Sequence, residues 1–409
     1  MAGVSEFIDE SIVPFYVAQM EKDGTPLPDL AGEPIRRMGE MLTHEPYTEP
    51  TPSVADDLAV LQYTGGTTGV AKGAMLSHRN LASNAKQTWE WTSEEVKKTT
   101  REEGGSTLAI APLFHVYGLT VCMNSAILTG GCMLLIPRFV AQDMLNAVRQ
   151  YRPAVFPGVP TMYMALANLP DITPDDCASL KVCISGSAPL PHEVQESFKE
   201  KTGVLVVEGY GLTESSPSTH ANPIGRNKPG TIGVPLPSTE AAIIDANTGE
   251  HLGPGGVGEI AIHGPQVMQG YWQRPDETAK VMRDGWLLTG DIGTMDEEGY
   301  FTILDRSKDI IIAGGFNIYP REVEEVLFTH PAVLEAAVVG VKDVYRGETV
   351  KAFVVLKSDQ QVTDKELISF TREHIAVFKA PTAVEFLAEL PKTAVGKVLR
   401  RELAKGRSS

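Results

Sequence analysis

The sequence has 409 residues, of which 42% are hydrophobic and 22% charged, as in an ordinary globular protein with room for two or three domains. Its 36 basic residues (Lys and Arg) against 52 acidic ones give a net charge of −16, which argues against nucleic acid as a partner, because phosphate backbones need clustered basic side chains. The sequence shows neither a run of 18 apolar residues nor a signal-peptide pattern, and its four cysteines form no Cys-x-x-Cys pair, so we expect a reduced, cytoplasmic protein without a zinc site.

The first regular elements follow a proline-rich stretch. Residues 20–57 hold six prolines and many polar side chains, which is typical of an irregular connector. From Leu58 onward, apolar strand patterns alternate with helix patterns, which predicts a mostly parallel sheet covered by helices. The predicted strands are Leu58–Tyr63, Ser106–Ala111, Cys132–Ile136, Ala154–Phe156, Lys181–Ser185 and Val204–Glu208, and the predicted helices are Ser77–Trp91, Leu119–Leu128, Val140–Tyr151 and Pro191–Thr202.

The pattern changes after about residue 228 and again at Asp305. Short alternating segments, Glu240–Asp245 and Gly258–His263, predict an antiparallel sheet or small barrel. From Asp305 a compact α+β unit follows. We therefore predict an α/β fold with two domains: residues 1–304, with parallel αβ layers and a small barrel-like β region, and residues 305–409, a small α+β domain, with the boundary at Asp305–Arg306. The elements predicted in the second domain are the strands Ile310–Ile312, Val333–Val341 and Lys351–Leu356 and the helices Pro320–Phe328 and Thr363–His374.

The segment Tyr63–Gly73, YTGGTTGVAKG, follows the first predicted strand and is interpreted as a loop that leads into a helix. Its glycines let backbone amides approach phosphate oxygens, its threonine hydroxyls add donors, and Lys72 adds a cation. The common P-loop needs Gly before the lysine and Ser or Thr after it, whereas Ala71 and Gly73 stand there. A flexible surface loop is the alternative, but the donors gathered beside a lysine favour phosphate binding.

Seven motifs in a fixed order resemble those of the adenylate-forming enzymes, a family of acyl-CoA synthetases, luciferases and the adenylation domains of peptide synthetases. The resemblance implies a two-step reaction, in which a carboxylate attacks the α-phosphorus of ATP, pyrophosphate leaves, and the acyl group passes from AMP to a thiol. Besides the loop at 63–73, the motifs are LFHVYGL (Leu113–Leu119), SGSAPL (Ser185–Leu190), EGYGLTE (Glu208–Glu214), TGD (Thr289–Asp291), DRSK (Asp305–Lys308) and PKTAVGK (Pro391–Lys397).

The resemblance also implies how the nucleotide is held. Tyr210 is expected to stack on adenine, and Asp291 to accept hydrogen bonds from the ribose hydroxyls, with Arg306 as the cation on the ribose side. The small residues Gly186 and Ser187 are expected to let the adenine ring and the acyl chain pass close to the backbone. The full set of implied nucleotide-binding residues is Thr64, Gly65, Gly66, Thr67, Thr68, Gly69, Lys72, Gly186, Ser187, Gly209, Tyr210, Gly211, Thr213, Asp291, Arg306 and Lys397.

Four residues are implied to act on the reacting groups. Glu214 is the expected Mg²⁺ ligand, with Thr67 as the second protein ligand, because carboxylate, hydroxyl and phosphate oxygens suit this ion. His115 is expected at the carboxylate end of the acyl tunnel, although a lone His in an apolar run is usually a packed core residue. Lys397 is expected to bridge the carboxylate and the α-phosphate during adenylation, although a lone lysine near a chain end is usually solvated. The resemblance also implies that residues 305–409 form a mobile domain, hinged at Asp305–Arg306, which turns away for the second step.

Further resemblances concern the acid that is activated. The FHVY segment lacks the Asp that amino-acid-activating relatives use, and residues 284–306 resemble the fatty-acyl-CoA synthetase signature, with Leu288 where His is usual. Ile312 and Gly314 stand where aromatic-acid ligases have lysines. These features imply a long-chain fatty acid as substrate and CoA as acceptor, docking around Gly315. Amino-acid and aromatic-acid activation are disfavoured.

Only 62 residues precede the loop at Tyr63, fewer than in full-length relatives, so we expect a chain that is short at its N-terminus. Two other readings stay open: an acyl-AMP ligase that loads a carrier protein, although the insertion that such enzymes tend to carry after the large domain is not visible, and an inactive, truncated protein that binds acyl chains or nucleotide. A homodimer and a peripheral contact with the inner face of the cytoplasmic membrane are compatible with the sequence, but no residue pattern requires either. Chain-length preference cannot be read from these residues.

Overall fold

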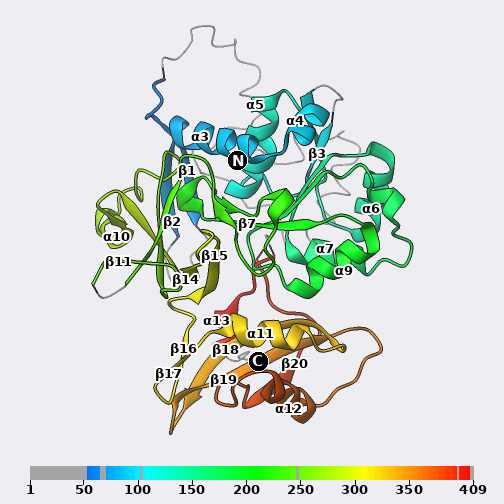
Figure 1. Cartoon of the computed structure of the whole chain (residues 1–409), viewed down its shortest axis with the longest axis vertical. Coiled ribbons are helices and arrows are strands. Elements are labelled where there is room, and N and C mark those ends of the chain that lie inside the picture. The colour runs from blue at the N-terminus through cyan, green and yellow to red at the C-terminus, as the bar shows by residue number, and fades with distance from the viewer. Residues whose placement is uncertain (1–52, 65–70, 102–104, 246–247, 394–395, 406–409) are drawn as a thin grey trace, which may run out of the picture. The chain divides into compact units, whose positions relative to one another are not determined.

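The structure is a computed structural model that describes residues 53–64, 71–101, 105–245, 248–393 and 396–405. These residues form four sheets of seven, six, five and two strands, with helices between and beside them (Figure 1). The predicted α/β class is therefore confirmed. The boundary and hinge predicted at Asp305–Arg306 stay predictions. Both residues lie at the end of one strand of the six-stranded sheet.

The seven-stranded sheet holds most of the predicted αβ alternation. Its first five strands in spatial order are parallel, and each of the last two pairs antiparallel with the strand before it. Phe156, Tyr163 and Phe198 are fully buried between the sheet and its helices and form the centre of the core. In spatial order the strands are β4 (Cys132–Leu135), β3 (Ser106–Ala109), β5 (Val155–Gly158), β6 (Val182–Ser185), β7 (Val206–Gly211), β8 (Ser218–Ala221) and β9 (Val234–Pro235), and the helices that follow β4 to β6 are α6 (Ala141–Tyr151), α7 (Pro160–Ala167), α8 (Pro174–Cys177) and α9 (His192–Thr202).

The helix predicted at Ser77–Trp91 is α3, His78–Trp91. Ser77 is its N-cap, and its side chain accepts from the backbone of Asn80 while the Asn80 side chain accepts from Ser77, as in a capping box. The predicted helix at 119–128 is helical throughout, but it begins with a π-helical stretch. The elements beside α3 are α4 (Glu94–Arg101), the π-helix η2 (Gly118–Asn124) and α5 (Ser125–Thr129).

The phosphate-loop prediction needs one correction. The loop does not lead into a helix: it joins two antiparallel strands, β1 (Leu58–Thr64) and β2 (Lys72–Ser77), and α3 follows β2. Lys72 is the first residue of β2 and pairs with Thr64. The pairing of β2 with β1 decides its structure, whereas its local sequence, KGAMLS, carries no clear strand pattern.

The predicted antiparallel region is a sheet of six strands. Its order is β11, β10, β12, β14 and β13, with β15 paired to β14. Ile243, Ile260 and Ile262 are fully buried and pack with Leu76 of β2, which joins this sheet to the hairpin. The elements are β10 (Glu240–Ile244), β11 (His251–Leu252), β12 (Gly258–His263), α10 (Pro275–Val281), β13 (Met282–Arg283), β14 (Trp286–Met295) and β15 (Phe301–Arg306), and the short 3-10 turns Thr213–Ser215 and Ile224–Arg226 precede them.

The five elements predicted in the C-terminal region agree with the structure to within a few residues, except that β19 begins four residues earlier, whereas β17, β20 and α13 were not predicted. Thr363 caps the last long helix and exchanges hydrogen bonds with Glu366. An apolar core that includes Val338, Val350 and Leu367 fills the space between the sheet and its helices. The strands are β16 (Ile311–Ala313), β17 (Phe316–Ile318), β18 (Val333–Asp343), β19 (Gly347–Leu356) and β20 (Ala383–Phe386), and the helices are α11 (Pro320–Phe328), α12 (Asp364–His374) and α13 (Arg400–Lys405).

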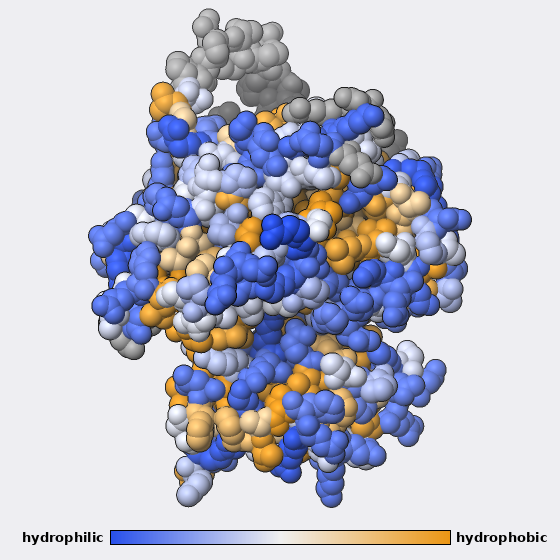
Figure 2. All heavy atoms as spheres, in the orientation of Figure 1, coloured by the Kyte–Doolittle hydropathy of each residue, from blue (hydrophilic) through white to orange (hydrophobic). Residues whose placement is uncertain are grey.

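The face of the molecule in Figure 2 is mostly hydrophilic, in keeping with the acidic composition, but hydrophobic residues gather between β3 and α6. Within the part of the chain that the structure describes, every helix is too short or too polar to cross a membrane. Among the described strands, β4 is the outermost of the large sheet on this side, and its Leu135 is 61% exposed.

Candidate active site

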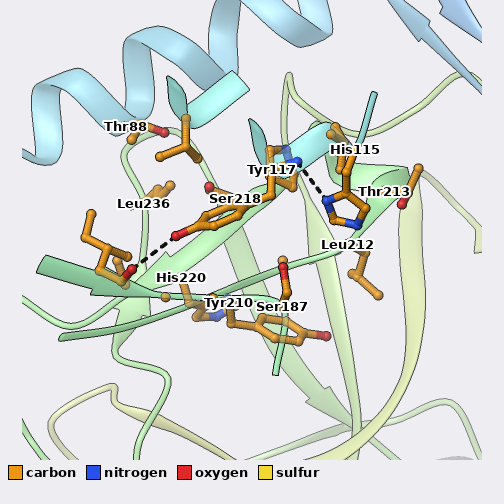
Figure 3. A pocket seen from close by; sticks show the side chains of 18 of the residues that line it. Thr88, His115, Tyr117, Ser187, Tyr210, Leu212, Thr213, Ser218, His220 and Leu236 are labelled. Carbon is orange, nitrogen blue, oxygen red and sulfur yellow. Dashed lines mark hydrogen bonds between the residues drawn. The ribbon is translucent and has the colours of Figure 1, made fainter. Parts of the chain in front are cut away.

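A cavity of about 610 Å³ is lined by residues of the hairpin, of both larger sheets and of the C-terminal segment (Figure 3). Every predicted site residue in the described part of the chain lines it. The predicted loop residues Gly65, Gly66, Thr67, Thr68 and Gly69 lie outside the described residues. Those that line the cavity are Thr64, Lys72, His115, Gly186, Ser187, Gly209, Tyr210, Gly211, Thr213, Glu214, Asp291, Arg306 and Lys397.

Lys72 enters the cavity from the base of the hairpin and is held by two groups that the sequence did not suggest. Its Nζ lies 2.6 Å from Oε2 of Glu277 and 4.8 Å from the centre of the Tyr271 ring. Lys280 and then Lys72 lower the pKa of the Glu277 carboxyl to about 2, so Glu277 stays ionised at any working pH. Lys72 is thus a positioned cation at the end of β1 and β2.

Glu214 lies in a 3-10 turn directly after β7, with Thr213 beside it. Its Oε1 accepts a hydrogen bond of 2.6 Å from the Tyr271 hydroxyl. Among the described residues the structure gives its other carboxylate oxygen no partner, and the side chain lines the cavity. One carboxylate with a free oxygen fits an Mg²⁺ ion that takes its remaining ligands from phosphates and water. No group of three or more His, Cys, Asp or Glu suited to a metal occurs in the described ranges.

Tyr210, Asp291 and Arg306 form a connected set at the junction of two sheets. The Tyr210 hydroxyl donates to Oδ2 of Asp291 at 2.5 Å, and Nε of Arg306 lies 3.4 Å from Oδ1. Asp291 and Arg306 are opposite one another on β14 and β15, so strand register brings them together. Burial and then the charge of Asp291 hold the pKa of Tyr210 above its ordinary value, which keeps its hydroxyl a donor.

Lys397 reaches the same cavity from the C-terminal segment. Its backbone N–H donates to Oγ1 of Thr393, and Gly396 before it has a φ of 78°, a conformation that favours glycine. Burial and then the charge of Arg306 lower the pKa of Lys397 to about 7, against a smaller opposite effect of Asp291. Among the described residues it forms no ion pair within 4.0 Å, so its charge is unmatched.

His115 lines the cavity within reach of the charge of Lys397. Its Nδ1 accepts from the backbone N–H of Tyr117 at 3.3 Å, which leaves the proton on Nε2. Burial and then the charge of Lys397 hold the pKa of His115 below its ordinary value, so the ring is neutral. Figure 3 shows His115 and Thr213 on one side of the cavity and Thr88 and Leu236 on the other.

The glycines of the motifs give the cavity its shape. A Cβ on Gly211 would lie 1.9 Å from the carbonyl oxygen of Pro217, so no other residue fits at this position. A Cβ on Gly186 would lie 3.2 Å from the Tyr117 ring, whose hydroxyl donates to the carbonyl of Ile184. Tyr117 therefore fixes the wall beside Ser187. The sequence alone indicates no role of its own for it, since it is only one residue of the motif LFHVYGL.

The other end of the cavity is apolar, and its wall was not predicted. It is formed where α3, α4, η2 and α5 meet, and α3 packs against both η2 and α5. No motif marks this wall, because each residue reads as ordinary helix core. The apolar residues that line it are Trp89, Trp91, Val96, Val121 and Ala126.

A second group of charges, here called the paired cluster, consists of Glu208, Asp305, Arg321, Glu324 and Arg400 and lines a smaller cavity of about 250 Å³. Both nitrogen–oxygen contacts between Arg400 and Glu324 are 2.8 Å, and Arg321 lies 3.7 Å from Glu208. Burial raises the pKa of Glu324 and of Glu208 to about 7, against the opposite effect of their arginines.

Comparisons with known proteins identify the family of the chain. A family described as AMP-binding enzyme matches residues 12–272, and the AMP-binding enzyme C-terminal domain matches residues 322–397. A long-chain-fatty-acid–CoA ligase of Bacillus subtilis is 55% identical over 348 residues, which cover 85% of this chain and 61% of that protein. One of Escherichia coli O157:H7 is 45% identical, covering 86% and 62%. The chain thus spans about three fifths of the length of these relatives.

Solved structures are similar to this chain in fold. ATP-bound MatB from Rhodopseudomonas palustris superposes with a TM-score of 0.81 at 38% identity, over 86% of this chain and 69% of that one. The anthranilate CoA ligase AuaEII in complex with anthranoyl-AMP gives a TM-score of 0.80 at 31% identity, over 88% and 69%. One of these similar structures therefore holds ATP, and the other an acyl adenylate.

Proposed function

The chain belongs to the AMP-binding enzymes, and we propose that it activates long-chain fatty acids with ATP and transfers them to CoA. One observation carries the proposal: a single cavity joins the charged residues of the motifs to an apolar wall of helix residues. A fatty acid has the same two parts, a carboxylate and an apolar chain. The long-chain-fatty-acid–CoA ligases among the similar proteins support this choice of acid.

The first step forms a bond between a carboxylate oxygen and the α-phosphorus of ATP, and the bond from that phosphorus to pyrophosphate breaks. No protein nucleophile is needed, so the site must position two anions and reduce their repulsion. Lys397 suits this role because it is an unmatched cation in the cavity, held near His115. Glu214 would hold Mg²⁺, and the ion would supply further charge neutralisation. In the second step the sulfur of CoA attacks the acyl carbon and AMP leaves.

The nucleotide side follows from the connected set of Tyr210, Asp291 and Arg306. Both carboxylate oxygens of Asp291 are in contact with a neighbour: Oδ2 accepts from the Tyr210 hydroxyl at 2.5 Å, and Oδ1 lies 3.4 Å from Nε of Arg306. These contacts hold the carboxylate in position for the ribose hydroxyls. Lys72 at the base of the phosphate loop faces the triphosphate. We propose in addition that residues 305–409 turn about Asp305–Arg306 between the two steps, so that Lys397 serves only the first.

The experiment supplies ATP, Mg²⁺ and palmitate, with and without CoA, and follows pyrophosphate and acyl-CoA. We expect pyrophosphate in both cases and palmitoyl-CoA only with CoA, with benzoate as a poor substrate. Pyrophosphate without any thioester would favour a carrier protein as acceptor, and neither product would overturn the proposal. Gel filtration and co-sedimentation with vesicles test the separate expectations of a homodimer and a peripheral membrane contact.

A further inference from the structure

Tyr271 is joined to the phosphate hairpin although almost 200 residues separate them in the sequence. It forms an antiparallel bridge with Ala74 of β2. Backbone N–H groups of Met75 and Trp272 donate to Gly270 and Gly73, each at 2.8 Å, so residues 270–272 act as a short third strand of the hairpin. Tyr271 is 6% exposed, and its position is therefore set by the same hydrogen bonds that hold β2.

From this position Tyr271 touches two charged residues of opposite sign. Its hydroxyl donates to Oε1 of Glu214 at 2.6 Å. Its ring lies 4.8 Å from the Nζ of Lys72, a distance at which the ring attracts the ammonium. One side chain thus touches both the expected Mg²⁺ ligand and the expected phosphate-binding lysine.

Helix α10 fixes the outer side of this arrangement. Glu277 pairs with Lys72 at 2.6 Å, and the neighbouring Thr278 accepts from the backbone N–H of Tyr271 at 2.9 Å. The helix therefore binds both the lysine and the tyrosine, so that Lys72 has a carboxylate on one side and an aromatic ring on the other.

We propose that Tyr271 is a positioning residue that aims Glu214 at Mg²⁺ and Lys72 at the triphosphate, with Glu277 as the second support of the lysine. The inference rests on the proposed function, because Glu214 and Lys72 act on Mg²⁺ and ATP only if ATP is the substrate. The hydroxyl leaves one oxygen of Glu214 for the metal. Loss of a hydrogen-bond partner that orients a metal ligand lowers metal affinity or activity by roughly 10- to 100-fold.

The test separates the two contacts of Tyr271. Tyr271→Phe keeps the ring and removes the hydroxyl, so we expect about tenfold more Mg²⁺ at half-maximal pyrophosphate formation, with recovery at high Mg²⁺. Glu277→Gln keeps the hydroxyl contact, so we expect a higher KM for ATP at an unchanged Mg²⁺ midpoint. A calorimetric titration with α,β-methylene-ATP at several Mg²⁺ concentrations measures the same shifts without turnover.

Tyr300 offers a matched control. It is equally buried, its hydroxyl donates to the carbonyl of Arg226 at 2.7 Å, and Lys228 lies 5.2 Å from its ring, but it does not line the cavity. Tyr300→Phe should leave the Mg²⁺ midpoint unchanged. The inference is overturned if the Mg²⁺ midpoint of Tyr271→Phe lies within twofold of that of the unaltered chain. It is also overturned if the only change in this variant is a much lower melting temperature. An unaltered chain without Mg²⁺-dependent nucleotide binding or pyrophosphate release overturns the proposed function itself.

Discussion

The molecule holds two groups of charge near its cavities, and they differ in whether the charges are matched. In the paired cluster, Arg400 makes two 2.8 Å contacts to Glu324. Burial alone would lower the pKa of Arg400, but Glu324 and Asp305 raise it above its ordinary value. Lys397 lies in the same segment of chain, three residues earlier, and its pKa is lowered to about 7.

The difference separates charge used for structure from charge kept for a ligand. A charge that is removed from water is unfavourable unless a partner replaces the water. The partners of Arg400 belong to the protein, so its charge is satisfied before any substrate arrives. Within the part of the chain that the structure describes, Lys397 has no such partner, so an incoming anion would supply it. A lysine in a cavity whose pKa is shifted by burial is therefore a candidate functional residue. The charges of the paired cluster contact one another, so we assign that cluster a structural role.

The largest effect is expected at Lys397. Lys397→Ala should lower pyrophosphate formation from ATP and a fatty acid by about 10²- to 10³-fold, because the transition state loses a preorganised cation. Thioester formation from preformed acyl-AMP should stay within a few-fold of the unaltered chain, since that step does not bring the carboxylate to the α-phosphorus. The two half-reactions are measured separately.

Lys379→Ala is the control for loss of a lysine from the C-terminal region, because Lys379 pairs with Glu322 at 2.6 Å and does not line either cavity. It should leave both half-reactions unchanged. Equal loss of both half-reactions in Lys397→Ala would show that the lysine supports the fold or both steps, and the comparison between the two charge groups would fail.

Glu324→Ala tests the opposite expectation, a large effect on stability. Removing this carboxylate leaves Arg400 short of a partner, and arginine cannot lose its proton. We expect the free energy of unfolding to fall by about 3 kcal/mol, at the low end for a broken buried pair because the Arg400 side chain is 22% exposed. Urea denaturation followed by circular dichroism measures the change.

Glu385→Ala removes a more exposed partner, since Glu385 is 48% exposed and pairs with Lys351. Its expected cost is below about 1 kcal/mol. If Glu324→Ala costs no more than this control, the paired cluster is not what holds this part of the fold together.

Proton uptake offers a smaller but sharper measure of Lys397. Its pKa is about 7 in the free chain, so above pH 7 the lysine is increasingly neutral, and a bound anion returns the proton. ATP binding should therefore take up almost no proton at pH 6 and close to one at pH 8.5. Affinity should fall by up to about tenfold for each pH unit above 7.

Calorimetric titrations of ATP in two buffers of different ionisation enthalpy give the number of protons taken up. The charged groups that face Lys397 are Arg306, Asp291, Lys308 and Asp309. The variant Lys397→Ala keeps all four, so it serves as the reference that lacks only the proton uptake of Lys397. Uptake that is the same with and without Lys397 would assign the proton to another group.

Much of the fold was readable because the signals were local. The helix at Asp364–His374 carries its own cap at Thr363 and ends within its predicted range. The parallel strands of the large sheet are short apolar runs between helices, and each was predicted to within a few residues. Motif residues from distant parts of the chain meet in one cavity, because strand β7, the pair β14–β15 and the C-terminal segment all contribute residues to its wall.

The remaining features depend on contacts between distant residues. Strand β2 is defined by its pairing with β1 and with residues 270–272, and neither partner is visible in the sequence KGAMLS. Glu277 resembles any acidic residue in the first turn of a helix, where such residues are common. Trp89 and Val121 read as ordinary helix residues, because a sequence does not show on which side of a packed helix a cavity has been left.

The smallest predicted effect concerns the apolar wall of the cavity. It differs from both charge groups because it would select an acyl chain only by the space that its side chains leave. Val121 is 7% exposed and lines the cavity from η2. Val121→Phe should shorten the available space and move the kcat/KM ratio of decanoate to palmitate up by roughly tenfold, and Val121→Ala should move it the other way by a smaller factor. Both acids are compared within the same variant, so a general loss of stability cancels from the ratio. If the two substitutions shift the ratio in the same direction, or leave it unchanged, the acyl chain lies along a different wall of the cavity.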